Sequence, residues 1–226
     1  MSTFVLVHGA WCDGSVWRQV TPPLTAAGHR AEPIAGLPSG GPELADLAAD
    51  AKHVRAVVDG LPEGEDVVLV GHSYGGMVIT ELADHPRVRH SVYLAAFLPG
   101  AGESIMDLRS EHTVEWVVPA PAGAALRVTG DPEVAQLVMA ADLPADRFAE
   151  FFAGLRQQSI ASFTSPSGAP ARHHPVTYLL CSRDESILPA NQERMAAGAD
   201  RVHRLDAGHM VMLSRPTEVA ELLLGV

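Results

Sequence analysis

Apolar residues form two kinds of pattern along this chain. Short, nearly continuous apolar runs such as residues 3–8 and 66–70 are typical of strands buried on both faces of a parallel sheet. Between such runs apolar residues recur at helical spacing, as at Leu44, Leu47 and Val54. Strands are expected at residues 3–8, 29–34, 66–70, 88–98, 175–181 and 201–205, and helices at residues 15–27, 43–60, 77–84, 132–141, 145–158, 189–197 and 217–224. The alternation predicts an α/β protein with a mostly parallel sheet of about six strands, helices on both faces and right-handed crossovers.

The alternation is interrupted between Gly100 and Arg172. This stretch carries scattered Pro and Gly, helical fragments and several aromatic residues. A long irregular stretch inside a compact domain is uncommon unless it has a function of its own. We therefore expect residues 1–99 and 173–226 to form the core, and residues 100–172 to form an inserted, small and mainly helical cap.

The most informative motif is Gly-His-Ser-Tyr-Gly-Gly at residues 71–76. It follows an apolar, β-branched run and precedes a helical segment, which places Ser73 at a strand-to-helix turn. In such a nucleophile elbow the serine backbone is strained, so the neighbours two residues away, here Gly71 and Gly75, must lack side chains. The turn presents the hydroxyl at the edge of the sheet, beside a helix N-terminus that favours negative charge. Ser73 is therefore the candidate nucleophile.

A serine hydroxyl becomes a good nucleophile when a base accepts its proton and a third group holds that base in the right tautomer. Asp184 and His209 each follow a predicted strand, so both are expected at the sheet edge that carries Ser73. The order serine, acid, histidine is one of the known orders for such triads. Glu185 is the fallback acid, whereas Asp206 is too close to His209 along the chain to reach its ring from the opposite side. The cap is expected to lie over this active site.

Acyl transfer also requires two backbone N–H groups that stabilise the oxyanion of the tetrahedral intermediate. Tyr74, directly after the nucleophile, supplies the first. The loop after the opening strand supplies the second through Ala10, and Gly9 allows the backbone to approach closely. Trp11 is the alternative donor, and His8 is interpreted as structural.

Composition narrows the classes of partner. The 226-residue chain has a formal net charge of −11 and no cluster of Lys or Arg, so nucleic acid is a poor partner. A strand pattern begins directly after Ser2, which leaves no room for a signal peptide, and no apolar run is long enough to span a membrane. These features predict a cytoplasmic protein. Cys12 and Cys181 fit no metal or redox motif, so we expect two buried thiols, no metal and no cofactor. The single lysine, Lys52, disfavours Schiff-base and Ser-Lys mechanisms.

Taken together, the segments F-V-L-V-H-G-A, G-H-S-Y-G-G-M, Y-L-A-A-F-L-P and G-H-M-V-M-L resemble the α/β-hydrolase superfamily over nearly the whole chain. The branch it resembles most contains small methyl-salicylate and other methyl esterases together with hydroxynitrile lyases. The resemblance implies the roles already assigned to the triad and the oxyanion donors. Lyases of that branch carry a threonine after the first histidine and a lysine after the catalytic histidine. Here those positions are Gly9 and Met210, so the resemblance implies an esterase.

The sequence thus predicts a serine hydrolase of the carboxylesterase type that cleaves a small or medium ester in two acyl-transfer steps. Candidate substrate-binding residues are the apolar or aromatic side chains of Trp11, Phe97, Trp116, Phe151, Phe152, Phe163 and Met210. Two rivals stay open: a cofactor-free C–C hydrolase, cyclase or lyase of the same fold, and a small-molecule receptor that retains the triad. The expected partner is a small-molecule ester, and the sequence leaves a homodimer open as the assembly.

Overall fold

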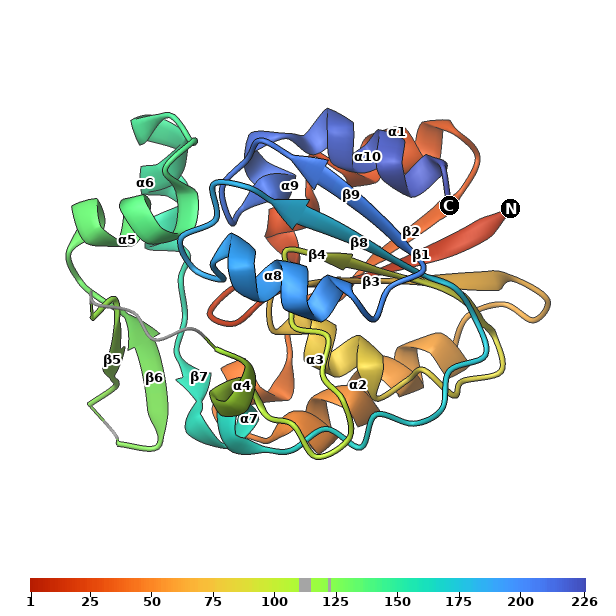
Figure 1. Cartoon of the computed structure of the whole chain (residues 1–226), viewed down its shortest axis with the longest axis horizontal. Coiled ribbons are helices and arrows are strands. Elements are labelled where there is room, and N and C mark those ends of the chain that lie inside the picture. Colours follow the sequence, from red (N-terminus) through yellow and green to blue (C-terminus); the bar gives the residue numbers. More distant parts are fainter. Residues whose placement is uncertain (110–114, 122) are drawn as a thin grey trace.

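A parallel sheet forms the centre of the computed structural model, which describes residues 1–109, 115–121 and 123–226. The sheet has six strands in the order β2-β1-β3-β4-β8-β9 (Figure 1). They are β1 (Ser2–Val7), β2 (Arg30–Pro33), β3 (Asp66–His72), β4 (Val88–Leu94), β8 (Val176–Cys181) and β9 (Arg201–Leu205). The central strands are almost wholly buried, which explains their continuous apolar runs. The predicted fold class is confirmed.

Helices cover both faces of this sheet. α1 (Thr21–Ala26) and α10 (Pro216–Leu224) pack together on one face, and α2 (Leu47–Asp59) and α3 (Gly75–Thr80) pack together on the other (Figure 1). α8 (Pro189–Ala196) packs against β8, and α9 (Val211–Ser214) contacts α10. The core also contains the 3-10 turns η1 (Gly14–Trp17) and η2 (Pro38–Gly40). The helix expected at residues 15–27 is divided between η1 and α1. In the described part of the chain, no helix is both long and apolar enough to cross a membrane.

Several predicted element ends differ from the observed ones; the helix expected at residues 145–158, for example, ends at Ala153. Two of the differences have clear local reasons. The helix expected from residue 43 begins at Leu47, because Asp46 caps it and Leu44 has a positive φ of 47°. The strand expected to reach residue 98 ends at Leu94, because Ala95 turns the chain with a φ of 44°. Both turns involve the left-handed region of backbone conformation, which apolar periodicity does not reveal.

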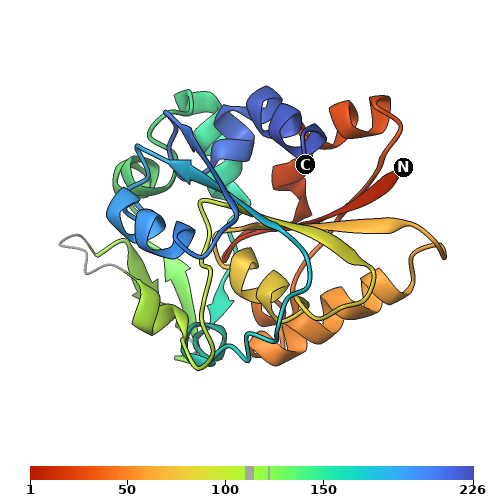
Figure 2. The same cartoon turned by 45° about the vertical axis from the view of Figure 1, so that its right-hand side comes forward.

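Between β4 and β8 the chain leaves the sheet, and we call residues 100–172 the excursion. It contains α4 (Ile105–Leu108), β5 (Val117–Pro119), β6 (Ala125–Val128), α5 (Pro132–Ala140), α6 (Ala145–Ala153), β7 (Gln158–Ser159) and α7 (Ile160–Thr164). β5, β6 and β7 form an antiparallel sheet that the sequence patterns did not predict. Two views show the excursion beside the carboxyl ends of the central strands (Figures 1 and 2). It therefore lies at the edge where ligands of open α/β sheets bind.

Candidate active site

Ser73 lies at the turn between β3 and α3 and has a φ of 53°. This conformation is sparsely populated for a residue with a side chain. A Cβ atom at Gly71 would lie 2.7 Å from the Gly75 carbonyl oxygen, and one at Gly75 would lie 2.5 Å from the Val7 carbonyl oxygen. Both positions therefore require glycine, and the strained elbow expected from the motif is present.

Asp184 and His209 are joined by a hydrogen bond of 2.7 Å between Asp184 Oδ2 and His209 Nδ1. Asp184 is fully buried, and its carboxylate also accepts hydrogen bonds from the Ser186 and Ile187 amides at 2.7 and 2.8 Å and from Gln192 Nε2 at 2.9 Å. These donors fix the carboxylate so that it faces the imidazole. Because Nδ1 donates to Asp184, Nε2 is left as the basic nitrogen.

The two rival acids lie elsewhere. Glu185 is exposed, and the side chain of Asp206 is 79% exposed and paired with Arg183 at 2.7 Å. In the described part of the chain neither carboxylate makes a hydrogen bond with His209, whereas Asp184 does. Gln192, which orients Asp184 from α8, was not predicted, because a neutral amide in a helix has no distinctive local pattern.

Hydrogen bonds from His72 and from the excursion help to hold the loop around His209. The Gly208 amide donates to Asp142 Oδ2 at 2.9 Å, and the amide that follows His209 donates to the Met139 carbonyl at 3.1 Å. His72 Nε2 donates to the His209 carbonyl at 3.0 Å. Burial, and secondarily the nearby His209, lower the pKa of His72 well below its usual value, so this ring acts as a neutral donor. Two of these contacts come from the excursion.

The amides of Ala10 and Tyr74 are available as donors: among the described residues, neither makes a backbone hydrogen bond. Ala10, Ser73 and Tyr74 line the same cavity. A Cβ at Gly9 would lie 2.9 Å from both Ser73 Cβ and His72 Nδ1. The loop after β1 thus approaches Ser73 so closely that only glycine fits at residue 9. Ser73 Oγ itself makes no hydrogen bond to His209 in the described structure.

The cavity next to Ser73 has a volume of about 480 Å³. Four of the predicted substrate-binding residues line it, namely Trp11, Phe97, Trp116 and Phe163. Trp11 contacts two of the others. Its ring packs edge-on against Trp116 at 5.3 Å and lies tilted by 35° against Phe163 at 5.5 Å, and its Nε1 donates to the Leu126 carbonyl at 3.1 Å. Further apolar lining residues that the sequence did not single out are Ile105, Met106, Val117, Val118, Pro119, Leu126 and Ile187.

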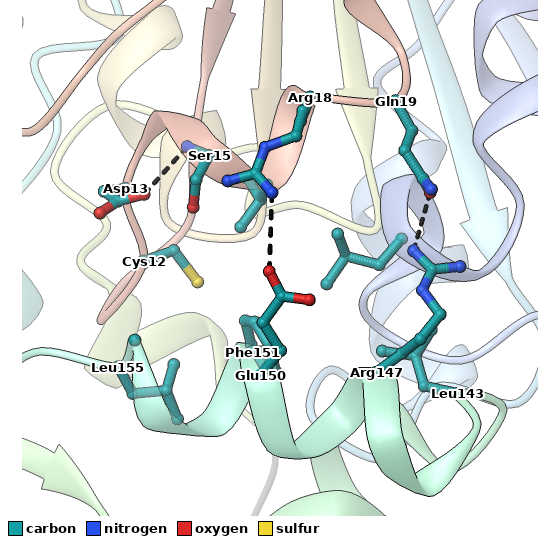
Figure 3. A pocket seen from close by; sticks show the side chains of 13 residues that line it. Cys12, Asp13, Ser15, Arg18, Gln19, Leu143, Arg147, Glu150, Phe151 and Leu155 are labelled. Atoms are coloured by element: carbon teal, nitrogen blue, oxygen red, sulfur yellow. Dashed lines mark hydrogen bonds and ion pairs between the residues drawn. The ribbon is translucent and has the colours of Figure 1, made fainter.

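The other three predicted pocket residues do not line this cavity. Phe151 lines a separate groove of about 170 Å³ between α6 and η1, where Figure 3 shows it beside Glu150, which pairs with Arg18. Phe152 stacks on Phe148 at 5.5 Å. Met210 is fully buried. For Phe151 and Phe152 the physical reason is that α6 lies against η1 rather than over Ser73, and helical periodicity does not reveal which neighbour an apolar face will meet.

Of the other titratable groups near the site, Arg109 and Glu115 line the cavity, whereas two cysteines and His8 are buried. Cys12 and Cys181 are free, buried thiols, as predicted, and burial raises the pKa of Cys12 to about 12. His8 is buried, its Nδ1 contacts the Gly9 carbonyl at 2.9 Å, and burial lowers its pKa. Within residues 1–109, 115–121 and 123–226, no three His, Cys, Asp or Glu side chains gather in a way that could hold a metal ion.

Comparison with known proteins identifies the family and several relatives of this chain. The profile of the alpha/beta hydrolase family matches residues 4–222. A carbendazim hydrolyzing esterase of Nocardioides sp. is 44% identical over 116 residues, which cover 48% of this chain and 47% of that protein. A polyneuridine aldehyde esterase of Rauvolfia serpentina is 27% identical over 257 aligned positions, which cover 99% of this chain and 94% of that protein.

Solved structures agree with the sequence comparisons. A novel pyrethroid hydrolase with BIF superposes with a TM-score of 0.84 at 25% identity, covering 100% of this chain and 96% of that one. The match to the carbendazim esterase spans less than half of that relative, whereas the family profile spans nearly this whole chain. The chain is therefore an enzyme that belongs to the alpha/beta hydrolase family.

Proposed function

We propose that this enzyme is a carboxylesterase whose catalytic triad consists of Ser73, His209 and Asp184. The observation that carries the proposal is the buried hydrogen bond of 2.7 Å between Asp184 and His209, found together with a strained serine that opens into a cavity of about 480 Å³. Relatives named as esterases and hydrolases support the same reaction class.

The mechanism follows from these atoms. His209 Nε2 accepts the Ser73 proton as Oγ attacks the ester carbonyl, and Asp184 stabilises the resulting imidazolium. The hydrogen bond from Oγ to Nε2 forms when the Ser73 side chain turns toward the imidazole, since such contacts tighten in the substrate complex. The Ala10 and Tyr74 amides stabilise the oxyanion, and the histidine then protonates the leaving alcohol. Water activated by the same histidine hydrolyses the acyl-enzyme.

The cavity favours small or medium apolar esters. Its volume and its tryptophan and phenylalanine walls suit a compact substrate with an apolar or aromatic group. Part of the wall comes from the excursion, through Trp116 and Phe163, so the excursion acts as the cap of the site. A clear preference for long-chain triglycerides would contradict this substrate size.

Two positions favour ester cleavage over the lyase reaction of similar enzymes. Gly9 leaves no side chain beside Ser73, because any Cβ would lie 2.9 Å from Ser73 Cβ. Met210 is buried and apolar, so it offers no cation for an anionic leaving group.

The test is covalent labelling of Ser73. A serine-directed phosphonate should add to the wild-type chain at Ser73, detected by intact-mass and peptide analysis, and should abolish ester turnover. Ser73→Ala should take no label and lose activity by a factor of about 10⁴ or more. Ser15→Ala, at an exposed serine, is the matched control and should behave as wild type. Wild-type turnover by Ser73→Ala would refute the mechanism.

A further inference from the structure

A buried carboxylate outside the triad lies behind the oxyanion site. Asp50 stands in the first turn of α2 and is fully buried, although the proposed triad does not use it. A buried carboxylate is retained only where hydrogen bonds compensate for its lost hydration. We propose that Asp50 is a positioning residue that holds Tyr74, and with it one oxyanion donor, through the Tyr74 hydroxyl. This inference rests on the proposed esterase function.

Asp50 receives its hydrogen bonds from two residues. Tyr74 Oη donates to Asp50 Oδ2 at 2.5 Å, and the Ser39 hydroxyl donates to the same oxygen. The Ser39 amide donates to Asp50 Oδ1 at 2.8 Å. Burial raises the pKa of Asp50, although the donors from Ser39 and Tyr74 lower it. Burial and the neighbouring Asp50 raise the pKa of Tyr74 well above its usual value, so the tyrosine keeps the proton it donates.

The excursion contributes to the same network. Gln158 is buried, and its Nε2 donates to Ser39 Oγ at 2.7 Å and to Ser162 Oγ at 2.8 Å. Ser162 in turn donates to the carbonyl of the residue three positions before it at 2.8 Å. Hydrogen bonds therefore run from the excursion through Ser39 and Asp50 to the Tyr74 ring.

The ring of Tyr74 is held on its face as well as at its hydroxyl. Phe163 stacks on it at a centroid distance of 6.3 Å and an interplanar angle of 22°. The Tyr74 side chain, which is fully buried, is thus fixed at two points. Its backbone follows directly on Ser73, whose φ of 53° stores strain that the surroundings must support.

The link to catalysis is the Tyr74 amide. In the proposed mechanism this N–H stabilises the oxyanion, and a small displacement of such a donor weakens transition-state binding more than ground-state binding. Loss of the Asp50 contact should therefore lower kcat while KM changes little. A purely structural contact would lower stability and leave kcat per active site unchanged.

The experiment compares two buried tyrosine hydroxyls in the full chain. Tyr74→Phe removes the donor to Asp50, and Tyr93→Phe removes a hydroxyl that pairs with Thr80 Oγ at 2.8 Å, away from the cavity. Active sites are titrated with the phosphonate, and kcat and KM are measured with one activated ester. We expect Tyr74→Phe to lower kcat about tenfold with KM within about twofold, and Tyr93→Phe to keep the wild-type kcat per active site.

A double-mutant cycle tests whether Asp50 acts through Tyr74. Asp50→Asn should lower kcat as Tyr74→Phe does, and the double variant should be no slower than the slower single variant. If Asp50→Asn does not fold, Ser39→Ala replaces it in the cycle. Unchanged kcat in Tyr74→Phe, or fully additive losses, would overturn the positioning role. Absence of a Ser73 adduct in the wild-type chain would instead overturn the proposed function, so the two failures are distinguishable.

Discussion

The Gly208 amide donates a hydrogen bond to Asp142 Oδ2 at 2.9 Å across 66 residues of sequence. Asp142 belongs to the excursion, and Gly208 directly precedes His209. The second oxygen of the carboxylate, Oδ1, is buried and has no hydrogen-bond partner among the described residues. The loop that carries the proposed base is therefore fixed by a segment outside the central sheet.

Asp142→Ala should lower kcat about tenfold and the free energy of unfolding by about 1–2 kcal/mol, because the Gly208 amide loses its acceptor. Asp142→Asn keeps a carbonyl acceptor and should retain most of the activity. Kinetics per titrated serine and urea unfolding measure both effects. Asp146→Ala, at an exposed carboxylate in α6, is the control. Wild-type kcat and stability in Asp142→Ala would contradict this role.

Gly75→Ala should destabilise the protein, whereas Gly130→Ala should not. A Cβ at Gly75 would lie 2.5 Å from the Val7 carbonyl oxygen, so β1 or the elbow must move. A Cβ at Gly130 meets nothing within 4 Å. We expect a loss of about 1–3 kcal/mol in unfolding free energy for the first and a change within about 0.5 kcal/mol for the second. Urea unfolding compares them, and equal midpoints would show that the elbow tolerates a side chain.

Stability should fall below about pH 6.5. Burial lowers the pKa of His72 and His8 in the folded chain, while both return to about 6.5 on unfolding. Below that pH the unfolded state binds protons that the folded state does not. The free energy of unfolding then decreases by up to about 1.4 kcal/mol per pH unit for each such histidine, and above about pH 6.5 this slope vanishes.

Urea unfolding between about pH 7.5 and pH 5 measures the slope. His203→Gln, at an exposed histidine, should leave it unchanged. A flat profile over this interval would mean that the buried rings accept protons without loss of the native packing.

Phe163→Leu should raise KM for aromatic esters between about threefold and tenfold, because it removes a ring that packs on Trp11 and Tyr74 in the cavity wall. Phe152→Leu should leave KM unchanged, since Phe152 packs on Phe148 instead. Steady-state kinetics with matched aromatic and small aliphatic esters measure the difference. A larger effect at Phe152 would place the substrate over α6.

The strands and the proposed triad were predictable because their signals are local. A strand buried on both faces is a continuous apolar run, and the elbow requires glycine at fixed positions around Ser73. Asp184 and His209 followed from the rule that carboxyl ends of parallel strands share one sheet edge.

The residues that hold the proposed triad and oxyanion donors in place could not be predicted, because their contacts are not local in sequence. Asp50, Asp142 and Gln192 act through partners distant in sequence, and each is an ordinary polar residue in its own segment. The small sheet of β5, β6 and β7 was not predicted, because strands of 3, 4 and 2 residues are too short to show an alternation of apolar and polar residues. Phe151 and Phe152 illustrate the same limit, since a helical pattern identifies an apolar face and not the element it packs against.

The close approach at Gly9 has a consequence for how this site could change its chemistry in evolution or in the laboratory. A threonine at residue 9 would place its Cβ 2.9 Å from His72 Nδ1 and from Ser73 Cβ, so a lyase-like side chain requires both a smaller residue at position 72 and a shift of the Ser73 elbow. His72 also holds the His209 carbonyl, so that replacement would release the loop of the base. The close spacing of the segments that carry Gly9, Ser73 and His209 therefore opposes conversion of ester cleavage into the lyase reaction. Such a conversion would have to pass through a variant in which the loop of the proposed base, His209, is held less firmly.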